Sequence, residues 1–191
     1  QRAAATAIEI DANNYNLFGV SGMSIYGLLN DPALPSALSP AQVDKKTAWA
    51  DKDANAIYND ILAMFNQIAA ASNGYVSFNS KLKLVVPPSI MGQLAKTTTL
   101  GVAPVLQTLK GFFPGLEIIS LPQLQDDSGL CKALLIATEI AGRPTAKFGF
   151  LEKLKTYPVL VEHSSMSQKW ASSTTGCLLF RPFAVATMTG I

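Results

Sequence analysis

The residues that could perform chemistry are few and scattered along the chain. In 191 residues there is one histidine, His163, and there are two cysteines, Cys131 and Cys177. A metal centre needs several His, Cys or carboxylate ligands close together. The only adjacent acids are Asp126 and Asp127, in a Gly/Ser loop where aspartate commonly shapes a turn. We therefore predict no metal site, no cofactor and two reduced thiols.

A hydrolase of the serine type would have to use His163 as its base, because the chain has no other histidine. Ser164 and Ser165 follow it directly, but a catalytic triad is a spatial arrangement, so adjacency in sequence is no evidence for one. The sequence has no GxSxG elbow, no phosphate-binding Walker loop and no GxGxxG motif. We predict that the protein is not an enzyme, and a small serine hydrolase using His163 is kept as an alternative of a different class.

A small group of lysines with interleaved aspartates precedes the longest predicted helix: Asp44, Lys45, Lys46, Asp51, Lys52 and Asp53. Alternating charges of this kind indicate a solvated or interface surface and not a track for phosphates. Trp49 and Trp170 are expected to be packing anchors. No nucleic-acid recognition site is predicted from these residues.

The composition indicates a subunit that covers much of its surface with copies of itself. Hydrophobic residues make up 49% of the chain and charged residues 15%, whereas about 25% charged is typical of globular domains. The net charge of +2 indicates neither a membrane nor a nucleic-acid partner. No apolar run approaches the roughly 20 residues that span a bilayer. A monomeric α+β binding module remains an alternative.

The apolar residues after Asp51 recur at i, i+3, i+4 and i+7, which predicts an amphipathic helix over 51–72. Asp51 or Asp53 can cap its start, and Ser72-Asn73-Gly74 is a normal helix exit. A second helix is predicted over 2–16. One long helix among short strands suggests a spine that supports a sheet.

The remaining elements are expected to be short. A strand over 81–86 leads to a short helix that begins at Pro88, and another helix follows Pro104. Further strands are predicted over 116–120, 130–138, 145–150, 157–162 and 177–187, with a polar loop at 123–129 and a Ser/Thr-rich segment at 163–175. This order is an α+β layout and lacks the regular βαβ alternation of doubly wound enzymes.

Three stretches resemble a family of tailed-phage major capsid proteins that includes prophage relatives. GMSIYGLLNDPALP at Gly22–Pro35 is similar to the family's "GIYGLLN-P-LP" segment. TGCLLFRPFAV at Thr175–Val185 is similar to its "TGGVVxRPLAV" ending, and LVVPP at Leu84–Pro88, with Leu94-Ala95 after it, is similar to "LLLPP…LLA". Order and spacing agree over residues 3–191, although 163–173 has no clear counterpart.

The resemblance implies an α+β fold shared by tailed-phage coats, encapsulins and the herpesvirus capsid floor. In that fold a peripheral (P) domain holds a long spine helix under a sheet, and an axial (A) domain packs around capsomer centres. Mapped by order, 51–72 would be the spine helix of a P domain at 1–83 and 154–191. Residues 84–153 would form the A domain, and the apolar strand at 177–187 would return to pack on the spine.

The function implied is self-assembly into hexamers and pentamers of an icosahedral shell that encloses double-stranded DNA. The implied partners are copies of the chain, possible scaffold, portal or decoration proteins, and packaged DNA through non-specific contact. The implied location is the virion capsid, assembled in the bacterial host cytoplasm. An encapsulin-like compartment with a protein cargo is the alternative within this fold. Residues 19–30 and 123–129 are our predicted subunit interfaces.

The family's N-terminal arm and its long β-hairpin, the E-loop, would precede Gln1. The sequence starts without methionine, inside a predicted helix. We therefore expect that an upstream segment was removed or lies outside this sequence.

Overall fold

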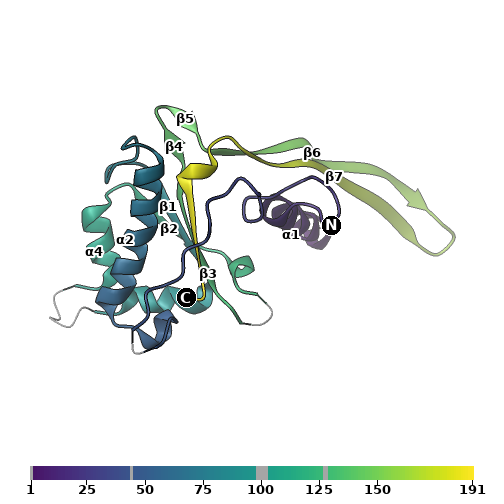
Figure 1. Ribbon diagram of the computed structural model, residues 1–191. Helices are drawn as coiled ribbons and strands as arrows, with labels where there is room; N and C mark the ends of the chain where they lie inside the picture. Colours follow the sequence, from purple (N-terminus) through teal and green to yellow (C-terminus); the bar gives the residue numbers. More distant parts are fainter. Residues whose placement is uncertain (1, 44, 98–102, 127–128) are drawn as a thin grey trace. The chain divides into compact units, whose positions relative to one another are not determined.

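The computed structural model describes residues 2–43, 45–97, 103–126 and 129–191 (Figure 1). The chain forms two compact units. The first joins Gln1–Ala33 with Ala146–Phe180 and is called the hairpin unit here; the second joins Leu34–Thr145 with Arg181–Ile191 and is called the sheet unit. In the described part of the chain, no helix has both the length and the apolar character needed to cross a membrane.

The sheet unit contains the long helix α2, Ala54–Ala71. The carboxylate of Asp53 caps it by accepting a hydrogen bond from the Ala56 amide at 2.9 Å. Asn73 and Gly74 then adopt left-handed backbone angles, which ends the helix. The prediction of a helix over 51–72 is confirmed with a start at residue 54, because Trp49–Asp51 forms a separate 3-10 turn, η1.

The sheet of this unit has four strands in the order β2-β1-β3-β8. Their bounds are Leu82–Val86 for β1, Leu116–Ser120 for β2, Lys132–Ala137 for β3 and Val185–Thr189 for β8. Strand β1 runs parallel to β2 and antiparallel to β3, which is itself antiparallel to β8. Helix α2 packs against β8 and β3 through a buried stripe: Ile57, Ile61, Met64, Phe65 and Ile68.

Short elements connect these strands. They are α3 at Pro88–Met91, η2 at Gly92–Ala95, α4 at Val105–Phe112, η3 at Pro122–Leu124, the pair β4 at Glu139–Ile140 and β5 at Arg143–Pro144, and η4 at Pro182–Ala184. The predicted helices at Pro88 and after Pro104 are confirmed, as are the predicted strands at 81–86, 116–120 and 130–138. The core under α2 includes the Phe65 and Phe113 rings, whose centroids lie 4.9 Å apart.

The hairpin unit consists of helix α1, Arg2–Phe18, and two antiparallel strands, β6 at Ala146–Val161 and β7 at Met166–Leu179 (Figure 1). Sixteen residues of β6 pair with fourteen of β7, so the register shifts at several points. Helix α1 packs against β7, where the Thr174 hydroxyl donates to the Asn16 side-chain oxygen at 3.2 Å. The predicted helix over 2–16 is confirmed.

The predictions for the last third of the chain were wrong in three places. The strands predicted at 145–150 and 157–162 are one strand, and most of the Ser/Thr-rich segment at 163–175 is strand β7. The strand predicted at 177–187 is broken by η4, and its first residues end β7. Strand β6 is exposed at nearly every position, so it needs no apolar alternation and its sequence shows no period-2 signal.

The boundaries of the two units also differ from the predicted domain boundaries at 83/84 and 153/154. Helix α2 belongs with 84–145 because its apolar stripe is covered by strands of the same sheet. Residues of β8 do return to pack on α2, as expected. Leu178, however, belongs to the hairpin unit and is 50% exposed, so the stretch 177–179 is not the continuously buried strand that was predicted.

Candidate interaction surface

His163 lies in the exposed turn between β6 and β7. It borders an open hollow together with Val161, Glu162 and Ser164. The Ser165 hydroxyl donates to the Glu162 carboxylate at 3.1 Å. Among the described residues, no hydrogen bond joins His163 to a serine. The turn therefore has the polar, solvated character predicted for it and no nucleophile–base pair.

The acidic loop forms a turn around Asp126. Its amide donates to the Leu130 carbonyl at 3.0 Å, and its carbonyl accepts from the Gly129 amide at 2.8 Å. Its carboxylate lies 3.2 Å from the Lys132 ammonium. Asp127 lies outside the described residues. Within the part of the chain that is described, no three His, Cys, Asp or Glu side chains are grouped so that they could hold a metal ion.

Both cysteines are free thiols. Cys131 is buried in the sheet unit and Cys177 is half-buried in the hairpin unit. Burial raises the pKa of the Cys177 thiol to about 11, and the nearby negative charge of Asp31 adds to the increase. At neutral pH this thiol is protonated and a poor nucleophile.

One member of the lysine group before α2 is not solvated, contrary to the prediction. Lys52 is buried, and its ammonium lies 2.6 Å from the carboxylate of Asp60 in α2. The Trp49 indole N–H donates to the same carboxylate at 2.9 Å. Trp49 is completely buried, so its predicted role as a packing anchor is confirmed. Lys46 fits the solvated description, in an exposed pair with Asp51.

Lys96 binds the same region from a distant part of the sequence. Its ammonium donates to the carbonyls of Trp49, Ala50 and Lys52 at 2.9, 2.8 and 2.8 Å. These carbonyls lie in and just after η1, where the backbone has few other partners. No local pattern predicts this contact, because the partners are more than 40 residues apart in the chain.

The main candidate site is the exposed apolar surface of the hairpin unit. Of twenty-three large hydrophobic side chains that are exposed among the described residues, all but six belong to this unit. The six in the sheet unit are Val43, Tyr75, Phe78, Phe112, Leu130 and Phe183. Monomeric proteins rarely expose large contiguous apolar patches, so such a concentration marks a surface that another molecule covers.

Exposed apolar side chains are also present at the distal end of the ribbon. Val161 pairs with Met166, and Val159 pairs with Gln168 two positions along, so these side chains share one face. Val161 is 71% and Met166 is 76% exposed. We call Val159, Val161 and Met166 the tip patch. A lone two-stranded hairpin is marginally stable in water, so this end needs a partner.

Positive charge lies on the other face of the ribbon from the tip patch, because Lys169 alternates with Gln168 along β7 and Lys155 pairs on the Lys169 side. The ammonium groups of Lys155 and Lys169 each lie 5.7 Å from the centre of the Tyr157 ring, within the range of a cation–π contact. Lys155 also pairs with Glu152 at 3.1 Å, which raises the pKa of the lysine through that hydrogen bond and the carboxylate's charge.

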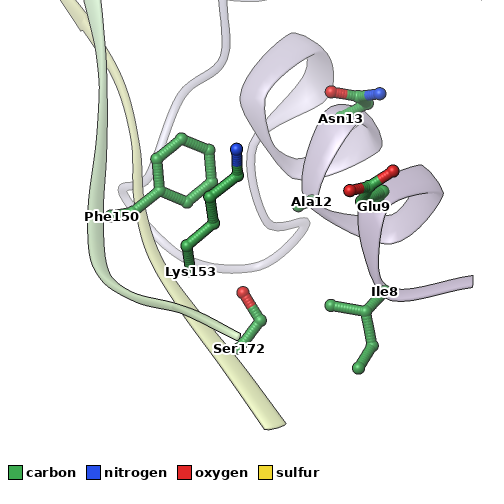
Figure 2. Close-up of a pocket in the computed structure, with 7 residues that line it drawn as sticks. All are labelled: Ile8, Glu9, Ala12, Asn13, Phe150, Lys153 and Ser172. Carbon is green, nitrogen blue, oxygen red and sulfur yellow. The ribbon is translucent and has the colours of Figure 1, made fainter. Parts of the chain in front are cut away.

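Helix α1 contacts the ribbon through a narrow stripe that contains Ile8 and Ala12, and its packing there is incomplete. A cavity of about 290 Å³ remains between the helix and both strands (Figure 2). Its lining consists of Ile8, Glu9, Ala12, Asn13, Phe150, Lys153 and Ser172. Trp170 is half-buried on the neighbouring part of β7 and borders a second hollow with Tyr15, in agreement with its predicted packing role.

The opposite side of α1 carries a second apolar stripe. Ala3, Ala7, Ile10 and Phe18 recur at helical spacing and are all exposed, and Ile10 is 50% accessible. We call these four residues the outward stripe. Ile10 follows Ile8 by two positions, which is about 200° around the helix, so the two point to opposite sides.

The stretch 19–30, a predicted interface, packs on the end of α1. The Leu28 and Leu29 amides donate to carbonyls of that helix at 3.0 and 2.9 Å. A Cβ on Gly27 would overlap the Leu17 carbonyl, so only glycine fits there. Met23 and Tyr26 are exposed on this stretch. The interface roles of 19–30 and 123–129 stay predictions, and the second of these ranges is only partly described.

Comparison with known proteins gives a family and a fold. Residues 1–190 match the family model described as "Pa193 gp26 major capsid protein". No curated protein matches the sequence. Among solved structures, the capsid of Myoviridae phage XM1 superposes with a TM-score of 0.79 at 15% identity, over 100% of this chain and 63% of that chain.

Two further structures are similar. A virus-like particle from Pyrococcus furiosus has a TM-score of 0.62 at 14% identity, over 94% of this chain and 64% of that chain. A Mycobacterium phage Che8 structure has a TM-score of 0.57 at 13% identity, over 97% and 60%. The chain thus spans less than two thirds of the length of these solved chains. The predicted α+β fold of phage coat proteins is confirmed.

Proposed function

The chain belongs to the Pa193 gp26 major capsid protein family, and on that premise we propose that it is a structural coat subunit whose copies assemble into a shell. The observation that carries the proposal is the exposed apolar surface of the hairpin unit. Burying apolar surface stabilises an assembly by about 25 cal/mol for each Å² removed from water. In a shell each subunit is surrounded by other copies, and these copies can cover the exposed apolar surface.

The finer features of the proposal follow from the family. Copies form hexamers and pentamers of an icosahedral shell, through contacts that join different patches on neighbouring subunits, because rings require such heterologous contacts. The shell encloses double-stranded DNA, which the chain contacts without sequence specificity. The protein is located in the virion capsid and is assembled in the bacterial host cytoplasm. Scaffold, portal or decoration proteins are further proposed partners.

We also propose a revised assignment of the P and A domains. The sheet unit contains 84–145, which is nearly all of the segment that the resemblance maps to the A domain. The sheet unit is then the A domain and the hairpin unit is the P domain. Helix α1, which lies on the strands of the ribbon, takes the place of the spine helix that we had expected at 51–72.

The alternatives have less support. An encapsulin-like shell shares the fold, but the family model describes a major capsid protein. The hydrolase would need a serine bound to His163, and the described residues provide no such pair. A non-enzymatic role agrees with both observations.

Sedimentation velocity and negative-stain imaging of the intact protein test the proposal. We expect capsomers or closed particles, and a strict monomer at high concentration would overturn it. DNA that survives nuclease treatment inside the particles supports the phage shell, whereas an enclosed protein points to the encapsulin-like alternative.

Two matched substitutions test whether the hairpin unit carries the assembly. Val161→Asp places a charge in the tip patch, and Tyr75→Asp does the same at a side chain of similar exposure, 74%, in the sheet unit. We expect Val161→Asp to reduce assembly strongly with little change in the melting temperature, and Tyr75→Asp to reduce it less. Equal losses would show that the hairpin surface has no special role.

A further inference from the structure

The four-stranded sheet of the sheet unit has an open backbone edge on each side. We propose that these two edges join neighbouring copies, with β2 of one copy pairing in parallel with the segment 36–39 of the next. This inference rests on the proposed coat function and assigns one specific contact within it. It is carried by the free hydrogen-bonding groups of the two edges and by the side chains beside them.

The first edge is strand β2, which lies at one end of the strand order β2-β1-β3-β8. In its parallel ladder with β1, the odd-numbered residues from 115 to 121 bond to β1. Leu116, Ile118 and Ser120 therefore direct their backbone groups away from the sheet. Among the described residues, the Ile118 and Ser120 amides and the Leu116 and Ile118 carbonyls have no hydrogen-bond partner. This side of the sheet can accept a further strand.

The second edge is the segment 36–39, which we call the strap and which lies beside β8. Leu38 bonds to β8 through both backbone groups: its amide donates at 2.8 Å and its carbonyl accepts at 3.0 Å. Ala37 and Ser39 therefore direct their backbone groups outward. Both residues are exposed, and their amides and carbonyls have no partner in the part of the chain that the structure describes.

The free groups of the two edges match one another. The register is the one that places Ile118 opposite Leu38 of a second copy, with the two segments parallel. Four hydrogen bonds then form between the copies: from the Ile118 amide to the Ala37 carbonyl, from the Ser39 amide to the Ile118 carbonyl, from the Ala37 amide to the Leu116 carbonyl, and from the Ser120 amide to the Ser39 carbonyl. Every donor in this ladder meets an acceptor that is free in the single chain.

The side chains favour the same register. Leu38 and Ile118 are both partly buried against the core under α2, at opposite sides of the sheet. Pairing places them side by side on that face, so the apolar layer continues from one copy into the next. On the other face Glu117 lies opposite Ala37, so its carboxylate keeps its pair with Lys83 at 3.0 Å and meets no second acid. A slip of the strap by two residues would place Ile118 opposite a serine or a proline.

A second copy is the partner that satisfies both edges. One chain cannot pair its own β2 with its own strap, because β1, β3 and β8 lie between them. The contact joins different edges of two copies, so it is head-to-tail, and such contacts close into rings. Repeated around a capsomer, it occupies both edges of every sheet and leaves none open to unrelated strands.

A cysteine pair across the contact tests it in the intact protein. Ala37→Cys and Glu117→Cys are combined in one chain, and in the contact their Cα atoms lie about 4.8 Å apart in neighbouring copies, within disulfide range. The matched control combines Ala37→Cys with Lys83→Cys. Lys83 is the ion-pair partner of Glu117 and lies one strand further from the edge. Its Cα is then about 10 Å from Ala37 of the second copy, too far for a disulfide.

The expected result is a series of cross-linked products. After mild oxidation of the assembled protein, the pair with Glu117→Cys should give dimers, trimers and longer chains on a non-reducing gel. The pair with Lys83→Cys should give at least about tenfold less. Ala37→Cys alone reports the background from the native thiols.

The outcomes separate this contact from the coat function. Capsomers that form with cross-linking only at the level of the control pair would overturn the contact and leave the coat function standing. Products that stop at the dimer would overturn the head-to-tail arrangement, because each chain would then use only one edge. A chain that stays monomeric under all conditions would overturn both proposals.

Hydrogen exchange of the unaltered protein provides a second measurement if a cysteine variant does not fold. The amides that gain a partner in the contact are those of Ala37, Ser39, Ile118 and Ser120. They should exchange at least about tenfold more slowly in capsomers than in the free chain. The Glu117 amide faces β1 in both states and is the internal reference. Equal rates at the four edge amides in free and assembled protein would contradict the proposal.

Discussion

The ammonium of Lys52 lies 2.6 Å from the carboxylate of Asp60, and both side chains are almost wholly buried. The two residues join the segment before α2 to the middle of that helix. The same carboxylate accepts hydrogen bonds from the Trp49 indole at 2.9 Å and from the Ala41 amide at 3.0 Å. The Asp60 carboxylate thus binds three groups in the segment that precedes α2: the Ala41 amide, the Trp49 indole and the Lys52 ammonium.

Removal of the Asp60 carboxylate is expected to destabilise the protein strongly. Asp60→Ala leaves the buried Lys52 ammonium without its counter-charge and the indole without its acceptor. Loss of one partner from a buried pair costs about 3–5 kcal/mol of unfolding free energy. Urea unfolding measures the change. Lys46→Ala, which breaks the exposed pair with Asp51, is the control, and it should cost less than about 1 kcal/mol. Equal effects of the two substitutions would contradict this account.

Lys96 is expected to fix the backbone of η1. Lys96→Met keeps most of the apolar stem but removes the donor to three carbonyls, and hydrogen bonds of charged groups contribute about 1.5–3 kcal/mol each at most. We expect a lower melting temperature and faster hydrogen exchange at the Asp51 and Lys52 amides, which bond within this turn. Lys81→Met, at an exposed pair with Glu139, serves as the control. Unchanged exchange at residues 51 and 52 would show that Lys96 does not hold the turn.

Gly27 is expected to tolerate no side chain. A Cβ there would overlap backbone atoms of Leu17 and Phe18, so Gly27→Ala must displace the stretch 19–30 from the end of α1. Gly22→Ala in the same stretch meets no atom within 4 Å and carries only the strain of a left-handed backbone angle, about 1 kcal/mol. Thermal unfolding should therefore show a clearly larger loss for Gly27→Ala. The reverse order would mean that this packing is incorrect.

Cys177 is expected to react slowly with alkylating reagents near neutral pH. Its pKa is raised to about 11, so protons are lost only at higher pH than from an ordinary thiol, and less thiolate is present at pH 8. The labelling rate of the Cys177 peptide, followed by mass spectrometry, should rise about tenfold per pH unit and level off near pH 11. Because access affects the rate but not the pH at which it levels off, a plateau below pH 9 would contradict the raised pKa. Asp31→Asn should move the plateau to lower pH.

Much of the sheet unit could be predicted because its elements are half-buried. The apolar stripe of α2, the caps around Asp53 and Gly74, and the largely buried strand at 82–86 all show their structure as periodicity or as turn residues. The sequence of the hairpin unit has no comparable pattern. The segment 151–156 mixes Leu with Lys and Glu, and Pro158 normally argues against a strand interior. Strand β6 permits both, because residues 151–161 are exposed and have no core to match.

The candidate site was found by composition more than by motif. The low content of charged residues predicted that other copies cover part of the surface. The structure adds that most of the exposed large apolar side chains belong to the hairpin unit. The solvent exposure of Lys52 was predicted wrongly, because its residue type does not show that Asp60, eight residues later in α2, pairs with its charge. The predicted domain boundaries stay a prediction; the two compact units exchange chain at Ala33, Thr145 and Phe180, and chain order carries no information about such returns.

The register shifts between β6 and β7 affect how newly made chains behave before they assemble into a shell. A regular strand of this length with free backbone groups along its edge is a template for indiscriminate strand addition, and thus for aggregates of newly made chains. Extra residues in β6 interrupt that edge, and Pro158 lacks an amide hydrogen to offer to an incoming strand. The ribbon can therefore bind other copies through its apolar side chains while its irregular backbone edge disfavours the addition of further strands. Both properties are useful to a coat subunit that reaches high concentration before assembly.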